Sequence, residues 1–355
     1  MSESPWNSFL PASTLLGTWP EPNPPALNSL ARLASPTLLG GLSSASPSTT
    51  PNALAFPPSL SWRYVTRRFT QFLSNIELTT HQITDGQRKC RGVIACLNWA
   101  YYGHGSETEN AFLIGSWAKG TRVRPPRDVD LYFLLPAAVY HRFETYQGYR
   151  QSALLQEVKG KLLAKYPGSA IKGDGPVVLA AFESFSIEIV PAFALTEEHA
   201  YFVCDTKDGG AYKKTRPGDE AVAINTADQR NANNVRPLIR MLKVWQDWCS
   251  VPIKSFYLEL LAIEFLDQCA WRHQDHFYYD WICRDFFEWM VKKANTYLVA
   301  PNMSELFWLG NDWKSKAESA YRRADLACGF ERDNAMNDAG EMWQMIFGPN
   351  IPRNP

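Results

Sequence analysis

The period of the apolar residues changes twice along the chain. From residue 60 to 102 apolar side chains recur every three or four positions, which predicts one or two helices that end at Gly103. Short apolar runs then predict strands at 111–115, 128–135, 177–182, 185–193 and 201–205. A helical stretch at 152–166 interrupts them, and from about residue 219 onward the helical period returns.

This order of elements predicts the fold class. All the predicted strands lie in one block and must be covered on at least one face, so we expect an α+β core with a small mixed sheet and a C-terminal helical lobe. We place the core, with its N-terminal helix, at 59–218, the lobe at 219–348 and a tail at 349–355. A cleft between the lobes would be the natural ligand site.

Residues 1–58 differ in composition from the rest of the chain. They hold 11 of the 24 prolines and only three charged residues, Glu3, Glu21 and Arg32. Such a segment lacks the apolar face that would offset the entropy of ordering, so we predict that it is disordered or extended. A short docking peptide built on its aromatic residues Trp6, Phe9 and Trp19 is the alternative interpretation.

Charge and cysteine content point to the cell interior. The 36 Lys and Arg residues balance the 36 Asp and Glu residues, so only a local patch could attract nucleic acid or a membrane. The seven cysteines are scattered and form no CxxC pair, which favours buried thiols in a reducing compartment. Without a signal peptide or a long apolar run, the protein is predicted to be soluble and cytoplasmic.

One cluster of potential metal ligands has two interpretations. Cys269, His273 and His276 would share a face if they lay on one helix, and Cys283 follows, which is a ligand set that suits zinc. The spacing matches no standard zinc motif, and aromatic residues typical of a core surround it. A packed helix face is therefore the main interpretation, with zinc as the alternative.

Asp128 and Asp130 form a D-x-D pair at the start of a predicted strand. Side chains alternate along a strand, so both carboxylates point to one face while Val129 and Leu131 point to the other. Paired carboxylates repel each other unless solvent or cations neutralise them. Mg²⁺ prefers such oxygen ligands, and two ions held close together can promote in-line phosphoryl transfer.

A third carboxylate is expected beside this pair. Glu188 is the lone charge in the apolar run 185–193, where an unpaired charge would be costly. A position facing Asp128 and Asp130 would explain it. Glu188 would then bind metal and help to deprotonate an attacking hydroxyl group.

Gly115 and Ser116 follow a predicted strand and are expected to open a short helix. Free backbone N–H groups and the Ser116 hydroxyl could receive a phosphate there, and glycine permits close approach. Basic residues follow at Lys119, Arg122, Arg124 and Arg127. They could balance triphosphate charge, although a solvated basic loop is the alternative.

These motifs together resemble those of a known family. The pattern G-S-x(3)-G-T followed by D-x-D, with a carboxylate in a strand that ends V-P-A-F, resembles the DNA polymerase beta-like nucleotidyltransferase superfamily. The run NAFLIGSWAKGTRVRPPRDVDLYFLLP, with RPLIRMLKVWQ and IKSFYLELL in the predicted lobe, is similar to bacterial cGAS/DncV-like nucleotidyltransferases (CD-NTases). The resemblance covers roughly residues 60–348.

The resemblance implies roles for individual residues. Asp128, Asp130 and Glu188 match the metal-binding carboxylates, and Gly115 and Ser116 match the phosphate-binding turn. In the predicted lobe the matching residues are a lysine and a serine that contact the donor triphosphate and an aromatic residue that stacks on a base, at Lys243, Ser255 and Phe256. From the sequence alone, Phe256 would more often be a core residue.

The resemblance also implies an activity. We expect a transferase that uses two Mg²⁺ ions, for which Mn²⁺ could substitute, to join nucleoside triphosphates into a cyclic di- or trinucleotide second messenger for anti-phage defence of the CBASS type. A regulatory protein and a downstream effector of the product would be its partners, and activation by nucleic acid is left open. The alternatives are transfer of one nucleotide to an RNA end or a protein, and a catalytically silent sensor.

Overall fold

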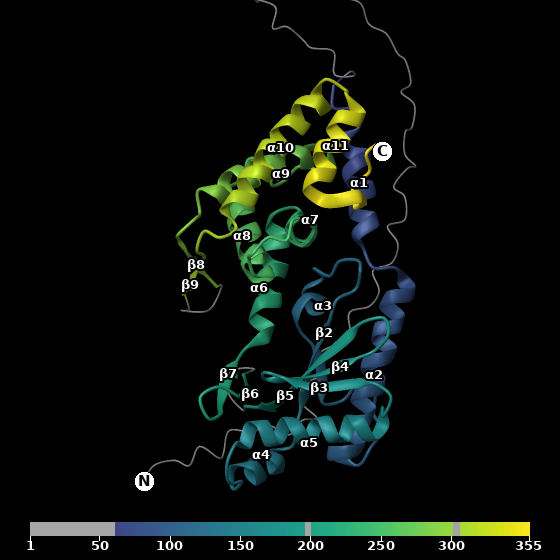
Figure 1. Cartoon of the computed structure of the whole chain (residues 1–355), viewed down its shortest axis with the longest axis vertical. Helices are drawn as coiled ribbons and strands as arrows, with labels where there is room; N and C mark the ends of the chain where they lie inside the picture. The colour runs from purple at the N-terminus through teal and green to yellow at the C-terminus, as the bar shows by residue number, and fades with distance from the viewer. Residues whose placement is uncertain (1–60, 196–199, 301–305) are drawn as a thin grey trace, which may run out of the picture.

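The described residues form a part built around a sheet and a part built from helices (Figure 1). The computed structural model describes residues 61–195, 200–300 and 306–355. Figure 1 shows the larger sheet in the lower, blue to teal half of the molecule and a helical lobe, mostly green to yellow, above it. The predicted α+β class with a C-terminal helical lobe is confirmed, whereas the predicted disorder of 1–58 lies outside the described residues.

The sheet of the described residues has seven strands in the order β1-β2-β5-β4-β3, with β6 paired to β5 and β7 paired to β6. Strands β2 and β5 are parallel and the other pairs are antiparallel. All five apolar runs form strands, whereas β3 and β7 were not predicted because these mostly exposed strands carry little apolar alternation. The bounds are β1 (Ala111–Leu113), β2 (Val129–Leu134), β3 (Ala170–Asp174), β4 (Val177–Ala181), β5 (Ser186–Ala194), β6 (Tyr201–Asp205) and β7 (Ala211–Thr215).

Helices cover one face of this sheet. Helix α2 (Thr80–Tyr102) begins with a capping box between Thr79 and Gln82 and ends, as predicted, at Gly103, which has a φ of 74°. Helices α2 and α5 (Arg150–Lys165) pack their apolar residues against the Val129, Leu131 and Phe133 side of β2. The remaining helices of this part are the short α3 (Gly115–Lys119) and α4 (Ala137–Glu144).

The opposite face of the sheet is only partly apolar. Tyr132 and Leu134 of β2 and Val190 of β5 form a smaller cluster there. Because side chains alternate, Asp130 and Glu188 lie on this same face at the start of the two strands. The sheet therefore presents its acidic residues on the face that α2 and α5 leave open.

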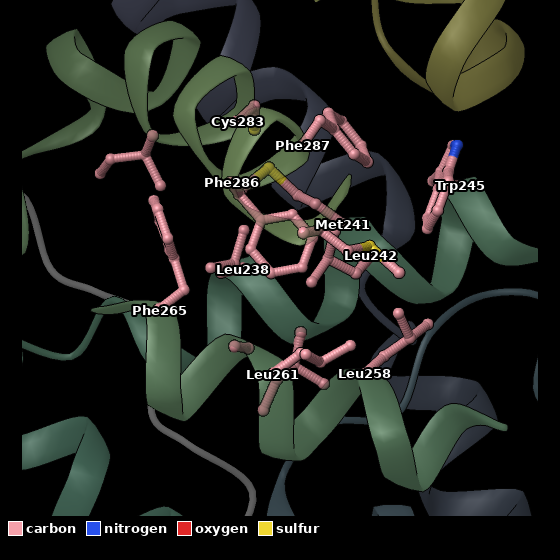
Figure 2. Close-up of a cluster of buried hydrophobic side chains, with 14 of the residues drawn as sticks. Leu238, Met241, Leu242, Trp245, Leu258, Leu261, Phe265, Cys283, Phe286 and Phe287 are labelled. Carbon is pink, nitrogen blue, oxygen red and sulfur yellow. The ribbon is translucent and has the colours of Figure 1, made fainter. Parts of the chain in front are cut away.

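The helical lobe has a continuous apolar core. Figure 2 shows side chains from three helices, among them Leu242, Leu261 and Phe286, pointing toward one another. A hairpin of β8 (Tyr297–Val299) and β9 (Leu306–Trp308) interrupts the helical sequence and was not predicted. Among the described residues no helix is long and apolar enough to cross a membrane. The helices are α6 (Pro217–Arg230), α7 (Val235–Trp248), α8 (Ser255–Gln268), α9 (Tyr279–Val291), α10 (Lys314–Arg332) and α11 (Met336–Phe347).

Both ends of the described chain pack on the helical lobe. Phe69 and Phe72 of α1 (Val65–Ile76) lie 5.2 Å and 5.0 Å, between ring centroids, from Trp343 and Phe347 of α11. Of the helical stretch predicted to belong to the core at 59–218, α2 packs on the sheet, whereas α1 packs on the lobe instead. The predicted tail at 349–355 is likewise held to the lobe, since Ile351 is fully buried in its core.

The predicted helix face around Cys269 does not form. Helix α8 ends at Gln268 and Cys269 has extended backbone, so Cys269, His273 and His276 do not share a helical face. Trp271 stacks on Tyr278 here, with 5.3 Å between ring centroids. Within the ranges that the structure describes, no three His, Cys, Asp or Glu side chains are gathered closely enough to hold a metal ion as they stand, and this region gives zinc no support.

A buried ion pair fixes α1 to the lobe. The Arg68 Nε atom lies 2.6 Å from Oε1 of Glu331, and both side chains are fully buried. Arg68 also donates to the backbone carbonyls of Met336, Pro352 and Arg353. One guanidinium group thus connects α1, α10, the start of α11 and the chain end.

Replacement of Arg68 by alanine should therefore destabilise the lobe. Glu331 would keep a buried charge without its partner, which typically costs about 3–5 kcal/mol. Urea unfolding followed by tryptophan fluorescence would measure the free energy of unfolding. The neighbouring Arg67 is exposed, so Arg67→Ala serves as the matched control and should change it by less than about 0.5 kcal/mol. Equal effects of the two variants would contradict this account.

Candidate active site

A cavity of about 260 Å³ lies between the sheet part and the helical lobe. Its walls come from α3, the start of β2, β5, α7 and α8. The cavity is lined by the predicted metal-binding carboxylates and by the residues predicted to bind nucleotide: Gly115, Ser116, Lys119, Asp128, Asp130, Glu188, Lys243, Ser255 and Phe256. Arg124 of the predicted basic cluster does not line it. The fold thereby brings together residues that are up to 141 positions apart in the chain.

Strand register sets the carboxylates side by side. Asp130 of β2 is the direct partner of Glu188 in the parallel β2–β5 pair, and their carboxyl groups are hydrogen-bonded to each other. Asp128 precedes β2 and is exposed at the mouth of the cavity. The parallel pairing was not predicted, but the shared face of these side chains was.

The environment of the carboxylates favours their neutral forms. Burial raises the pKa of Asp130 to about 6, and the charge of Asp128 adds to this effect. Burial and the nearby charges of Asp130 and Asp128 raise the pKa of Glu188 to about 7. The cluster is thus short of positive charge and holds a shared proton near neutral pH.

Gly115 is needed for the close approach of Asp130. A Cβ atom at position 115 would lie 1.9 Å from Oδ2 of Asp130, and the φ of Gly115 is 59°. Ser116 follows in the first turn of α3, as predicted, where backbone N–H groups lack helical partners. The turn therefore places N–H donors and a hydroxyl group beside the carboxylates.

A buried ionic network forms part of the cavity wall and links the two lobes. The Glu259 carboxylate lies 2.6 Å from Nζ of Lys119 and 2.7 Å from Nζ of Lys243. Thr121 donates its hydroxyl to Glu259, and Lys119 makes a second ion pair, 2.9 Å long, with Glu220. Burial opposes ionisation of Glu259, but the two ammonium groups outweigh it and lower its pKa.

Internal ion pairs compensate part of the predicted basic cluster, namely Lys119 and Arg127. Lys119 is only 6% exposed, and its charge is already balanced by Glu259 and Glu220. Arg127 pairs with Asp247 at 2.8 Å. The sequence places these cations next to one another, but tertiary contacts decide which of them keep charge for a ligand.

Ser255 and Phe256 begin helix α8 at the edge of the cavity. Ser255 donates its hydroxyl to Oε1 of Gln246 at 2.8 Å. Phe256 is half-buried and packs edge-to-face on Phe307 of the hairpin, with 5.5 Å between ring centroids. The ring therefore has both the core contact expected from sequence alone and a place on the cavity wall.

Sequence reasoning missed Glu259 and Thr121. Glu259 is a single charge in the apolar run SFYLELLAI, only four residues after Ser255. A lone carboxylate in an apolar run was the signal that identified Glu188, and it could have identified Glu259 as well. Its partners, Lys119 and Lys243, could not be read from the sequence because they lie on separate elements.

The donor set of the carboxylate cluster fits a hard divalent cation. Asp128, Asp130 and Glu188 offer oxygen atoms alone, and burial together with mutual repulsion raises the pKa of Asp130 and Glu188, an effect that a bound cation would oppose. The carboxyl groups of Asp130 and Glu188 are hydrogen-bonded to each other, so their side chains would have to rotate before all three residues could coordinate one ion. Magnesium or manganese could be held by these residues.

The carboxylate cluster should make the metal-free protein less stable as pH rises. The pKa values of about 6 and 7 exceed those of the unfolded chain, which are about 4, so the folded state binds more protons between these limits. The free energy of unfolding, measured with EDTA, should fall as pH rises from about 4 to about 7. The loss should be smaller in Asp130→Asn/Glu188→Gln.

Two comparisons make this pH test specific. Burial also raises the pKa of Asp280 to about 7, and that contribution is common to wild type and variant. Asp208→Asn, at an exposed turn position, should keep the wild-type slope. If the free energy of unfolding depends on pH equally in wild type and in the double variant, the pKa values of Asp130 and Glu188 are not raised in the folded protein.

Known proteins share this fold. The E. coli MS115-1 CdnC structure with ATP superposes with a TM-score of 0.60 at 16% identity, covering 81% of this chain and 98% of CdnC. A second CdnC structure is a complex with HORMA-deltaN. The Vibrio cholerae DncV cyclic AMP-GMP synthase, solved with the linear intermediate pppA(3′,5′)pG, has a TM-score of 0.57 at 15% identity and covers 82% of this chain and 87% of DncV.

Sequence comparisons agree with the structural ones. A probable cyclic nucleotide synthase of Bacillus cereus (strain VD146) is 23% identical over 279 residues, which is 67% of this chain and 81% of that protein. Residues 64–228 match the family described as Second Messenger Oligonucleotide or Dinucleotide Synthetase domain. Residues 64–228 therefore match a family of nucleotide second-messenger synthetases, and over most of its length the chain is similar to cGAS/DncV-like nucleotidyltransferases.

Proposed function

We propose that this protein uses Mg²⁺ to join nucleoside triphosphates into a cyclic di- or trinucleotide. The observation that carries the proposal is the single cavity lined by three carboxylates, the Gly115–Ser116 turn and the lobe residues Lys243, Ser255 and Phe256. Acidic, phosphate-binding and aromatic groups are the three kinds of contact that a metal-bound nucleotide requires.

The nucleotide would be held by groups from both lobes. The Ser116 hydroxyl and the N–H groups of the first turn of α3 are hydrogen-bond donors for its phosphates. Lys243 and Ser255 would contact the triphosphate from the lobe, and the Phe256 ring would stack on the base. Lys243 is held by Glu259 and Thr121, so its ammonium group is presented from a fixed position.

The transfer step uses the carboxylates of the sheet. A 2′- or 3′-hydroxyl oxygen of one nucleotide forms a bond to the α-phosphorus of another, and the bond from that phosphorus to the pyrophosphate oxygen breaks. Glu188 would accept the hydroxyl proton, and Asp128, Asp130 and Glu188 are the residues that would hold the divalent ions. When bound, these ions supply positive charge that steadies the attacking and leaving oxygens. A second transfer after the linear intermediate turns in the site closes the ring.

The biological setting is part of the same proposal. The product would be a second messenger in anti-phage defence of the CBASS type, read by a downstream effector, and the reaction would take place in the cytoplasm. The CdnC complex with HORMA-deltaN supports a protein regulator for this chain as well. The seven unpaired cysteines suit a reducing compartment.

Loss of the paired aspartates should abolish synthesis. Wild type incubated with all four nucleoside triphosphates and Mg²⁺ should release pyrophosphate and a cyclic product, identified by chromatography and mass spectrometry. Asp128→Asn/Asp130→Asn should reduce the rate at least about 100-fold, because the groups that hold the metal ions are lost. Asp208→Asn, on the exposed turn before β7, should retain wild-type activity.

Incubation with nucleoside triphosphates labelled at the α-phosphate distinguishes cyclic-nucleotide synthesis from the two alternatives, which are nucleotide transfer to a macromolecule and a catalytically silent sensor. Label that migrates with RNA or protein, without a cyclic product, would indicate transfer to a macromolecule. Absence of pyrophosphate release under every activator tried would indicate a sensor. Either result would overturn the proposed synthase activity.

Divalent cations should stabilise the protein through the same residues. At pH 8, binding of Mg²⁺ or Mn²⁺ should raise the Tm of wild type, by roughly 2–4 °C for each kcal/mol that binding adds to the free energy of unfolding. Differential scanning fluorimetry without nucleotide measures this directly. The rise should vanish in Asp128→Asn/Asp130→Asn and persist in Asp208→Asn. An equal rise in all three proteins would place the cation elsewhere.

A further inference from the structure

A second, larger cavity lies next to the catalytic one. It has a volume of about 420 Å³, within the usual range for small-molecule pockets. Residues at the end of α1, in and after α3, and around the α6–α7 junction form its wall. Trp117 and Arg122 line both cavities, so the segment that carries the phosphate-binding turn separates them.

This cavity gathers three guanidinium groups. Arg236 is satisfied within the protein, because it forms an ion pair with Asp228 and donates from Nε to the Lys119 carbonyl at 2.9 Å. Arg240 has a weaker partner, since its Nη1 atom lies 3.5 Å from Oε1 of Glu77, whose side chain is 59% exposed. The Nε atom of Arg240 is buried and has no hydrogen-bond partner among the described residues.

Arg122 lies in the same cavity with even less compensation. Its guanidinium lies 5.2 Å from the ring centroid of Trp117, and no described residue forms an ion pair with it. Burial and the positive charge of Arg240 lower the pKa of Arg122, and the charge of Glu77 only partly offsets this effect. Two like charges held together in a cavity are costly unless an anion joins them.

We propose that this cavity binds a small molecule through a doubly charged oxyanion held between Arg122 and Arg240. Two planar guanidinium groups suit the oxygens of a phosphate group or of a dicarboxylate. The site adjoins the nucleotide site: Arg122 lines both cavities, whereas Arg240 and Glu77 line only the second one, so the Arg240 variant is the one that reports on the second cavity alone. A bound anion would touch the back of the segment that carries Ser116 and Lys119.

Isothermal titration calorimetry tests the site without nucleotide or metal. Inorganic phosphate and, separately, succinate are titrated into the full chain in EDTA, so that no cation can draw phosphate to the catalytic carboxylates. At least one of the two should bind, which also distinguishes the two ligand classes. Arg122→Gln and Arg240→Gln should each weaken that binding about tenfold or more, because each removes a charge-assisted contact.

Two further variants separate this site from misfolding and from the catalytic cavity. Glu77→Gln removes the carboxylate that competes for Arg240 and should strengthen binding, a gain that a folding defect cannot produce. Ser116→Ala alters the phosphate-binding turn and should leave binding unchanged. Loss of binding in Ser116→Ala with no change in the two arginine variants would overturn the proposal, as would no binding of either anion to wild type. Because nucleotide transfer is not measured, this result is independent of the proposed synthase activity.

Discussion

The buried network of Glu259, Lys119 and Lys243 is the interaction on which the catalytic cavity depends. Lys119 belongs to α3 in the sheet part, whereas Lys243 and Glu259 belong to the helical lobe. Each of these charges is almost fully buried, and loss of any partner would leave another uncompensated. The lobes must therefore meet in the one arrangement that satisfies all three, and this arrangement forms the walls of the cavity.

The sheet supplies the opposite kind of charge environment. Parallel pairing of β2 and β5 places Asp130 beside Glu188, and the missing side chain of Gly115 allows Asp130 to approach the phosphate-binding turn. Within the ionic network the lysine and glutamate charges balance one another, whereas the sheet carboxylates Asp128, Asp130 and Glu188 form no ion pair with a described residue. Uncompensated negative charge on one wall and fixed ammonium groups on the other suit a cation bound together with a polyanion.

The local elements could be predicted because their causes are local. The alternation around Asp130 and the lone charge of Glu188 identify the acidic face of the sheet from residue types and spacing alone. Strands β3 and β7 were missed because exposed edge strands carry little apolar pattern. The placement of α1 was also missed, since the amphipathic helix itself does not reveal which apolar surface covers Phe69 and Phe72.

The sequence by itself determined the chemical groups of the site, the strand that carries them and the face to which they point. Tertiary structure alone decided which charges remain available to a ligand. Lys119 is neutralised by Glu259, which lies 140 positions away, while Arg122 is left beside a second cation. The physical reason is that periodicity and residue type act over a few neighbouring positions, whereas the charge balance of a buried group depends on whichever distant segment packs against it.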